Sequence, residues 1–275
     1  MNRILIAGVC KNVDSFLPRV IENIYKITRH FSAYKIIIVE NDSTDNTKQI
    51  LDNWAWEDDN VILKTLDNIH NYVPNKKYRT QYLAFCRNTY IEEITKLRNL
   101  GNISKISDYE YSIVLDMDDV MAKENFQEQG VLDSLQILRN NPKIGALTVN
   151  SLPKYYDIWA LRNNECFYDC WKKVFWSMQY EGLSYTQGIE KYVTVHAKDY
   201  SQNADLIPVQ SAFNGLAVYR NEALIHCRYT GIIDGLTVAP THLEPTGAEI
   251  CEHVPLNYMM RQLGYKIYIN PKMCI

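Results

Sequence analysis

Residues 111–119 read YSIVLDMDD, a short apolar run that passes directly into carboxylates at Asp116, Asp118 and Asp119. The run has the length and composition of a buried strand, which places the carboxylates at its carboxyl end. Mg²⁺ and Mn²⁺ bind few protein carboxylates and complete their shells with substrate oxygens. The stretch therefore predicts a divalent-cation site facing a diphosphate. The alternative is a turn that only ends the strand and caps the next helix.

The residues before this stretch alternate between strand-like and helical patterns. Apolar runs stand at residues 3–9, 35–39 and 61–66, and helical periodicity covers residues 14–29, about 47–56, and 78–97. Asp14 or Ser15 is placed to cap the first helix. The β-α-β-α-β order predicts an α/β fold with a mainly parallel sheet flanked by helices, whose site lies beyond the carboxyl ends of the strands.

A second polar cluster follows the second predicted strand, at residues 40–47, which read ENDSTDNT. Glu40 and Asn41 are expected at the same sheet edge as Asp116, where a carboxylate and an amide can bond a nucleobase. Ser43, Thr44 or Asp45 is expected to cap the helix that follows. Capping leaves Glu40 and Asn41 unexplained, which favours a binding role for them.

Two arginines lie eight residues apart on the third predicted helix, at Arg79 and Arg87. That spacing puts them on roughly one side of the helix, where their forked donors can meet phosphate oxygens. A solvated basic face is the alternative.

The second half of the chain is less regular. We expect a strand at residues 144–149, an extended stretch at 208–219, a turn-rich connection at 241–248, a helix at 249–263 and a closing strand at 266–269. Within the expected helix, Glu249 and His253 would share one face. His253 could be a metal ligand, a general base or a surface histidine.

Composition excludes several classes of protein. Hydrophobic residues make up 47% and charged residues 22% of the 275 residues, which excludes intrinsic disorder. The net charge of -3 argues against a nucleic-acid partner. No apolar run is long enough for an integral membrane segment, and no signal peptide is recognisable, so a cytoplasmic location is expected.

With these residues in hand, the chain resembles the GT-A-fold nucleotide-sugar glycosyltransferases, and most of all the fungal CAP59-related α-1,3-mannosyltransferase family. Four segments carry the resemblance in order: residues 40–47, 79–88, 156–162 (YDIWALR) and 209–216 (VQSAFNGL). The segments at 251–253 and 264–271 also resemble the closing part of many GT-A enzymes.

The resemblance implies one continuous GT-A (Rossmann-like) domain over residues 1–275. Its nucleotide-sugar-binding half would cover about residues 1–125, and its acceptor and sugar-pocket half about residues 126–275. It further implies Mn²⁺ (or Mg²⁺) as cofactor, a nucleotide-sugar donor with GDP-mannose slightly ahead of UDP-sugars, and a glycan or glycoprotein acceptor.

Roles carry over by position. The resemblance implies donor binding by Glu40, Asn41, Arg79, Arg87, Asp116, Trp159, Arg162, Asn214 and Gly215. It implies metal binding by Asp116, Asp118 and His253, and catalytic or supporting roles for Glu252, His253 and Asp119. A retaining enzyme, which the mannosyltransferase resemblance suggests, needs no protein base at the acceptor; an inverting one would use Glu252 or His253.

Two other functions are compatible with parts of this sequence. A haloacid-dehalogenase-type phosphatase would use Asp116 as nucleophile and Asp118 as acid/base, but that family places this motif on its first strand. A non-catalytic sugar-binding module would keep the fold without the reaction. A dinucleotide-binding enzyme is disfavoured, since Gly8 lacks the glycine-rich turn that should follow the first strand.

Overall fold

The computed structural model describes residues 3–73, 77–104, 109–235, 241 and 244–275. In its first half, strands and helices alternate as the apolar pattern predicts. The elements are β1 (Arg3–Cys10), α1 (Leu17–Thr28), β2 (Ala33–Asn41), α2 (Thr47–Glu57), β3 (Val61–Leu66), a 3₁₀ turn (Ile69–Asn71), α3 (Arg79–Ser104) and β4 (Tyr111–Asp116). The strands are nearly continuous apolar runs because helices cover both faces of the sheet.

The second half adds shorter elements and longer connections. They are α4 (Gln129–Asn140), β5 (Ile144–Asn150), α5 (Cys170–Tyr180), α6 (Tyr185–Tyr192), a second 3₁₀ turn (Thr194–His196), β6 (Ile207–Val209), β7 (Leu216–Arg220), α7 (Asn221–Leu224), α8 (His253–Gln262) and β8 (Lys266–Cys274).

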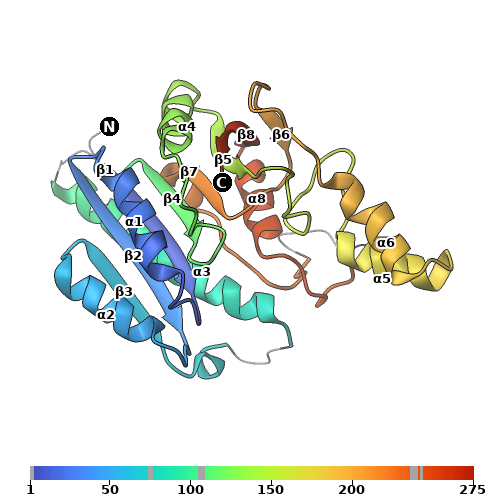
Figure 1. Ribbon diagram of the computed structural model, residues 1–275, viewed down its shortest axis with the longest axis horizontal. Helices are drawn as coiled ribbons and strands as arrows, with labels where there is room; N and C mark the ends of the chain where they lie inside the picture. Colours follow the sequence, from blue (N-terminus) through green and yellow to red (C-terminus); the bar gives the residue numbers. More distant parts are fainter. Residues whose placement is uncertain (1–2, 74–76, 105–108, 236–240, 242–243) are drawn as a thin grey trace.

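One sheet contains strands from both halves, in the order β3-β2-β1-β4-β7-β5-β8-β6 (Figure 1). Strands β3, β2, β1 and β4 run parallel to one another. Strand β7 lies between β4 and β5 and is antiparallel to both, and β6 is antiparallel to β8. The carboxyl ends of β1, β2 and β4 therefore meet at one edge of the sheet.

Two apolar layers cover the two faces of the sheet. Along β1, Leu5 and Ala7 join one buried cluster and Ile4 and Ile6 the other, as the alternation of side chains in a strand requires. The first cluster includes side chains of α3 and α8, and the second includes side chains of α1, α2 and α4. Helix α3 therefore packs against one face of the sheet. Its first residue, Arg79, lies close to the carboxyl edge of the sheet.

The predicted cap of the first helix is wrong. Phe16 occupies the N-cap of α1 without a side-chain cap, and Pro18 stands in the first turn. Asp14 instead accepts a hydrogen bond from the Asn46 amide at 3.2 Å, and so joins the loop after β1 to the loop after β2.

The last helix begins later than expected. Helix α8 starts at His253, whereas Glu249 forms a bridge with Ile232, so Glu249 and His253 do not share a helix face. Pro255 gives the reason. A helix from Glu249 would bury Pro255 in its interior, where the missing N–H breaks the ladder; a start at His253 leaves Pro255 in the tolerant first turn.

Two further expectations change in detail. Residues 208–219 form two separate strands, β6 and β7, because Asn214 and Gly215 adopt positive φ angles of 64° and 92° and turn the chain. Of the expected connection at residues 241–248, positions 242 and 243 lie outside the described residues. No helix in the described part of the chain is long and apolar enough to cross a membrane.

Candidate active site

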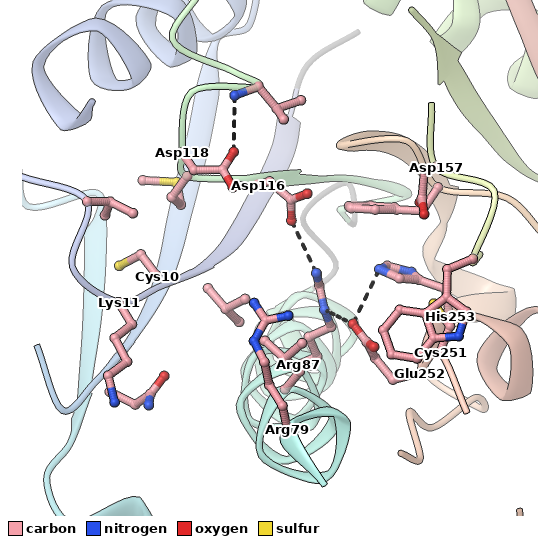
Figure 2. A pocket seen from close by; sticks show the side chains of 18 of the residues that line it. Cys10, Lys11, Arg79, Arg87, Asp116, Asp118, Asp157, Cys251, Glu252 and His253 are labelled. Carbon is pink, nitrogen blue, oxygen red and sulfur yellow. Dashed lines mark hydrogen bonds and ion pairs between the residues drawn. The ribbon is translucent and has the colours of Figure 1, made fainter. Parts of the chain in front are cut away.

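The carboxyl ends of three neighbouring strands open onto one cavity. Val9 of β1 pairs with Asp116 of β4, and Cys10 pairs with Glu40 of β2, which brings these strand ends together. The cavity has a volume of about 330 Å³, within the range of small-molecule sites. Its described lining residues are Val9, Cys10, Lys11, Val13, Asn41, Arg79, Leu83, Arg87, Asp116, Met117, Asp118, Val120, Tyr156, Asp157, Trp159, Phe213, Cys251, Glu252 and His253 (Figure 2).

Asp116 and Asp118 both face this cavity. Asp116 Oδ1 accepts a hydrogen bond from Arg87 Nη2 at 3.1 Å, and Asp118 Oδ1 accepts one from the Val120 amide at 3.1 Å. Burial raises the pKa of Asp116 to about 7, with Arg87 lowering it and Asp118 raising it. Burial also raises the pKa of Asp118. Raised pKa values mean that the ionised forms of these two neighbouring carboxylates are destabilised, so a bound cation would stabilise them. Asp119, in contrast, is exposed and is not among the described lining residues.

Arg87 lies inside the protein, not on a solvated face. Only 4% of the residue is exposed, and its guanidinium lies over the rings of Phe213 and Tyr229 at 5.1 and 5.7 Å. Nε donates to Glu252 Oε1 at 3.0 Å while Nη2 donates to Asp116, so one guanidinium joins two carboxylates (Figure 2). The spacing of eight residues predicts Arg79 and Arg87 on roughly one side of the helix, but the structure gives the two arginines different surroundings.

Arg79 is the exposed arginine of the pair. It is the first residue of α3 and lines both the active-site cavity and an adjoining cavity of about 710 Å³. Lys11, Asn41 and Leu83 also line both cavities, which makes the two spaces neighbours. Arg79 and Lys11 thus present positive charge where the cavities meet.

The cluster at residues 40–47 divides into a structural part and one lining residue. Glu40 is fully buried, and its Oε1 accepts from the Ser43 amide at 2.7 Å. Asp42 accepts from the amides of Asn68 and Ile69 at 2.6 and 3.2 Å. Asn41 alone in this cluster lines the active-site cavity among the described residues.

The hydroxyl and carboxylate groups of the same cluster fasten loops together. Ser43 Oγ accepts from the Asn12 amide at 3.0 Å, and Thr47 Oγ1 from the Val13 amide at 2.8 Å. Asp45 Oδ1 accepts from the Thr47 amide at 3.0 Å, at the start of α2. These bonds hold the loop after β1 in place, and with it Lys11.

Glu252 and His253 stand at the start of α8 and both line the cavity. The His253 ring stacks on Phe213 with centroids 3.8 Å apart, and neither ring nitrogen has a hydrogen-bond partner among the described residues. Burial, reinforced by the charge of Arg87, lowers the pKa of His253 well below its usual value, so the ring is neutral. A neutral imidazole of such low basicity is a poor general base at neutral pH.

The segment 156–162 contributes in two ways. Tyr156, Asp157 and Trp159 line the cavity, and Trp159 Nε1 donates to Asp169 Oδ2 at 2.9 Å. Arg162 is buried away from it: Nη1 donates to the carbonyls of Trp159 and Leu161 at 2.9 and 2.8 Å. Arg162 therefore supports the segment that carries Trp159.

Asn214 and Gly215 are not among the described lining residues, but they hold residues that are. Asn214 bonds Asp157 through backbone and side chain. The Gly215 carbonyl accepts from the Asp116 amide at 2.9 Å. A Cβ at Gly215 would lie 2.4 Å from Val120 Cγ1, and the φ of 92° is one that favours glycine.

Sequence reasoning missed Lys11, Tyr156 and Asp157 as lining residues. Lys11 directly follows β1 at the carboxyl edge, so its position relative to the strand was an available signal. Tyr156 and Asp157 belong to a segment that was singled out for Trp159 and Arg162, but nothing local indicates which of its side chains face the cavity.

Asp116 and Asp118 fit a hard divalent cation such as Mn²⁺ or Mg²⁺. Each hydrogen bond described above uses one oxygen of a carboxylate that has two. No group of three His, Cys, Asp or Glu side chains in the described ranges could hold a metal, so His253 does not complete a set with this pair. A Mg²⁺-like ion needs only one or two carboxylates when substrate phosphates supply further ligands.

Comparison with known proteins identifies relatives. The chain matches the family model described as Cryptococcal mannosyltransferase 1 over residues 3–246. The mannosyltransferase PcManGT from Pyrobaculum calidifontis, solved with GDP-Man and Mn²⁺, matches with a TM-score of 0.51 and 11% identity over 99% of this chain and 55% of that chain. TarS (residues 1–349) from S. aureus matches with a TM-score of 0.49 and 12% identity, over 98% of this chain and 58% of that one. Among curated proteins no match was found.

These solved chains are longer: this chain spans 55% and 58% of their lengths. The likeness to PcManGT extends over nearly the whole chain and confirms the predicted α/β architecture of GT-A type. The family match covers most of the chain, from β1 to beyond the segment that contains Asn214 and Gly215. The chain therefore belongs to the Cryptococcal mannosyltransferase 1 family.

Proposed function

We propose that this protein is a divalent-cation-dependent glycosyltransferase that moves a hexosyl group from a nucleoside diphosphate sugar to a hydroxyl of a glycan or glycoprotein. The observation that carries the proposal is the pair Asp116 and Asp118 in a cavity that also contains Lys11 and Arg79. Carboxylates for a cation, and cations for a diphosphate, are the two charge requirements of such a donor.

Asp116 and Asp118 would hold Mn²⁺ or Mg²⁺. When bound, the ion neutralises negative charge that grows on the leaving diphosphate. Arg79 and Lys11 add positive charge at the mouth of the cavity and orient the diphosphate, which is catalysis by positioning and electrostatics. Arg87 is not needed at the phosphates, because its guanidinium already pairs with two carboxylates of the protein, Asp116 and Glu252.

GDP-mannose is the first donor to test, followed by UDP-sugars. Family membership supports mannose as the sugar. The adjoining cavity, reached past Asn41 and Arg79, has room for a nucleoside and offers Asn12, Asn41 and Tyr78 as polar groups. Trp159, anchored by Asp169, would stack on the transferred sugar.

We propose a retaining outcome. The His253 ring is a poor base because burial depresses its basicity. The Glu252 carboxylate is already engaged by Arg87 at 3.0 Å. Neither group is poised to take the proton of an acceptor hydroxyl, which an inverting enzyme requires. The anomeric configuration of the first-formed product, read by proton NMR, decides between the two outcomes.

For the acceptor we propose a third cavity, of about 790 Å³, lined by amide side chains that include Gln127, Gln129, Gln202 and Asn203. Amides are suitable partners for sugar hydroxyls because they both donate and accept. This cavity approaches the first one around Gly215. A Cβ built there would lie 2.4 Å from Val120 of the first cavity and 3.2 Å from Ile275 of the third.

A thermal-shift and transfer screen tests the proposal. It would use GDP-mannose, UDP-glucose, UDP-galactose, UDP-N-acetylglucosamine and UDP-xylose with and without Mn²⁺, and α-1,3-mannobiose as acceptor. We expect Mn²⁺-dependent stabilisation by one donor and a product one hexose larger. Phosphate release from p-nitrophenyl phosphate without donor binding would favour the phosphatase, although Asp116 ends the fourth strand here and not the first. Donor binding without transfer or donor hydrolysis would favour a sugar-binding module.

A further inference from the structure

Arg87 is shared by two carboxylates that belong to different parts of the proposed mechanism. Asp116, at the end of β4, is a ligand of the proposed cation, and Glu252 precedes α8. The Arg87 guanidinium lies between them and bonds each through a different nitrogen, at 3.1 and 3.0 Å (Figure 2). One positive charge is therefore divided between a cation ligand and a second acid.

The guanidinium has little freedom to find other partners. It is buried between Phe213 and Tyr229, and its remaining nitrogen, Nη1, has no hydrogen-bond partner among the described residues. The neighbouring His253 is neutral and cannot take over the ion pair with Glu252. The balance between Asp116 and Glu252 is thus set mainly by Arg87 itself.

A divalent cation and Arg87 compete for Asp116. Both are positive and would share one carboxylate, so they would repel each other. The Glu252 carboxylate attracts the Arg87 guanidinium away from Asp116. By drawing it away, Glu252 makes Asp116 a better ligand without being a ligand itself.

We propose that Glu252 sets the cation affinity of the Asp116–Asp118 pair through Arg87, which acts as a positioning residue between them. The inference rests on the cation site of the proposed function. Because coupling between two sites is reciprocal, cation binding also strengthens the pair between Arg87 and Glu252. The sign of the effect is specific: Glu252 favours cation binding, and Arg87 opposes it.

The test measures Mn²⁺ affinity on the full chain without donor or turnover, by the paramagnetic resonance signal of free Mn²⁺. Because Arg87 also lowers the pKa of Asp116, each variant is compared at a pH above which its own Mn²⁺ affinity no longer rises, so that Asp116 is ionised in all of them. Glu252→Gln keeps the shape of the side chain and removes its charge. We expect it to weaken Mn²⁺ binding by about fivefold or more, since Arg87 then pairs with Asp116 alone. Arg87→Met should tighten Mn²⁺ binding by a similar factor.

The double variant separates this relay from a general loss of negative charge. On the Arg87→Met background, Glu252→Gln should have little further effect. Glu249→Gln is the matched control. It removes an acid three residues away that bonds Thr80 at 3.0 Å and is not among the described lining residues, so Mn²⁺ affinity should stay unchanged. Circular dichroism checks that each variant is folded.

A purely structural role for Arg87 gives the opposite sign for Arg87→Met, because a disordered site would bind Mn²⁺ more weakly and not more tightly. Equal effects of Glu252→Gln with and without Arg87 would overturn the relay, as would no effect at all. If Arg87→Met does not fold, Glu252→Gln must still weaken Mn²⁺ binding where Glu249→Gln does not, and equal affinities of these two variants would overturn the relay. If the wild-type chain binds no Mn²⁺, the cation site of the proposed function fails and the relay fails with it.

Discussion

Asn214 and Asp157 hold each other through two reciprocal hydrogen bonds. Asp157 Oδ2 accepts from the Asn214 amide at 3.0 Å, and Asn214 Oδ1 accepts from the Asp157 amide at 3.2 Å. Asn214 Nδ2 also donates to the Val149 carbonyl at 3.3 Å. Asp157 lines the active-site cavity, so the pair fixes one wall of it against the turn before β7.

Asn214→Ala should lower the free energy of unfolding by about 2–4 kcal/mol, because it strands buried polar groups and places alanine at a positive φ. Asn214→Gly keeps the backbone conformation and should recover part of that loss. Urea unfolding of the two variants measures the difference. Equal losses would show that backbone conformation contributes nothing at this turn.

Asp118→Ala should abolish Mn²⁺-dependent transfer while the fold persists, because it removes one of the two cavity carboxylates proposed to hold the cation. Asp119→Ala is the matched control: its side chain is exposed, and we expect most activity to remain. Transfer from GDP-mannose and thermal unfolding would be measured on both. Full activity of Asp118→Ala would contradict the cation assignment. Loss of transfer activity in Asp119→Ala would support the catalytic role that the family resemblance implies for Asp119.

Arg79→Gln should raise the KM for the donor by roughly tenfold or more, the size of a lost hydrogen bond to a charged phosphate. Because Arg79 is exposed, stability should change little. Arg139→Gln removes another exposed arginine, on α4, that is not among the described lining residues of these cavities, and should leave the KM unchanged. Equal effects of the two changes would indicate only long-range attraction of the donor.

Gln129→Ala should raise the acceptor KM without changing the donor KM, because Gln129 lines the third cavity. Gln136→Ala is closely matched: both glutamines lie on α4, and each donates to the residue four positions on, Asp133 and Asn140 respectively. Initial rates with α-1,3-mannobiose measure both. An unchanged acceptor KM in Gln129→Ala would exclude this cavity as the acceptor site.

The raised pKa of Asp116, about 7, gives two pH dependences of opposite sign. The folded state holds this proton more tightly than the unfolded chain does, so the carboxyl's contribution to stability is present at low pH and is lost as pH rises through about 7. Cation binding needs the ionised form, so Mn²⁺ affinity should rise with pH and level off above about 7.

Mn²⁺ titrations at several pH values check this dependence. Asp116→Asn removes the carboxyl that titrates near pH 7 and should remove the part of the rise in Mn²⁺ affinity that lies near that pH. An affinity that is already level well below about pH 7 would show that Arg87 keeps Asp116 ionised more effectively than burial opposes it.

Local pattern was enough to predict the sheet edge and its carboxylates. In a parallel sheet, strands that end in Glu40-Asn41 and Asp116-Met117-Asp118 place these polar residues at the same carboxyl edge. Pro255 offered a further local signal for the start of α8, and Lys11 for a lining residue, and both were available in the sequence.

The partners of Arg87 could not be predicted in this way. Glu252 lies 165 positions from Arg87 along the chain, and Asp116 lies 29 positions away. A spacing of eight on one helix treats Arg79 and Arg87 alike, yet tertiary packing buries one and exposes the other. Arg162 and Trp159 likewise belong to one segment, but of the two only Trp159 is among the described lining residues of the cavity.

The most direct test of the central claim is a calorimetric titration of the wild-type chain with GDP-mannose, in the presence of Mn²⁺ and in its absence. We predict one binding event that requires Mn²⁺ and disappears in Asp118→Ala. Binding of equal strength with and without Mn²⁺ would contradict a cation held between Asp116, Asp118 and the donor diphosphate.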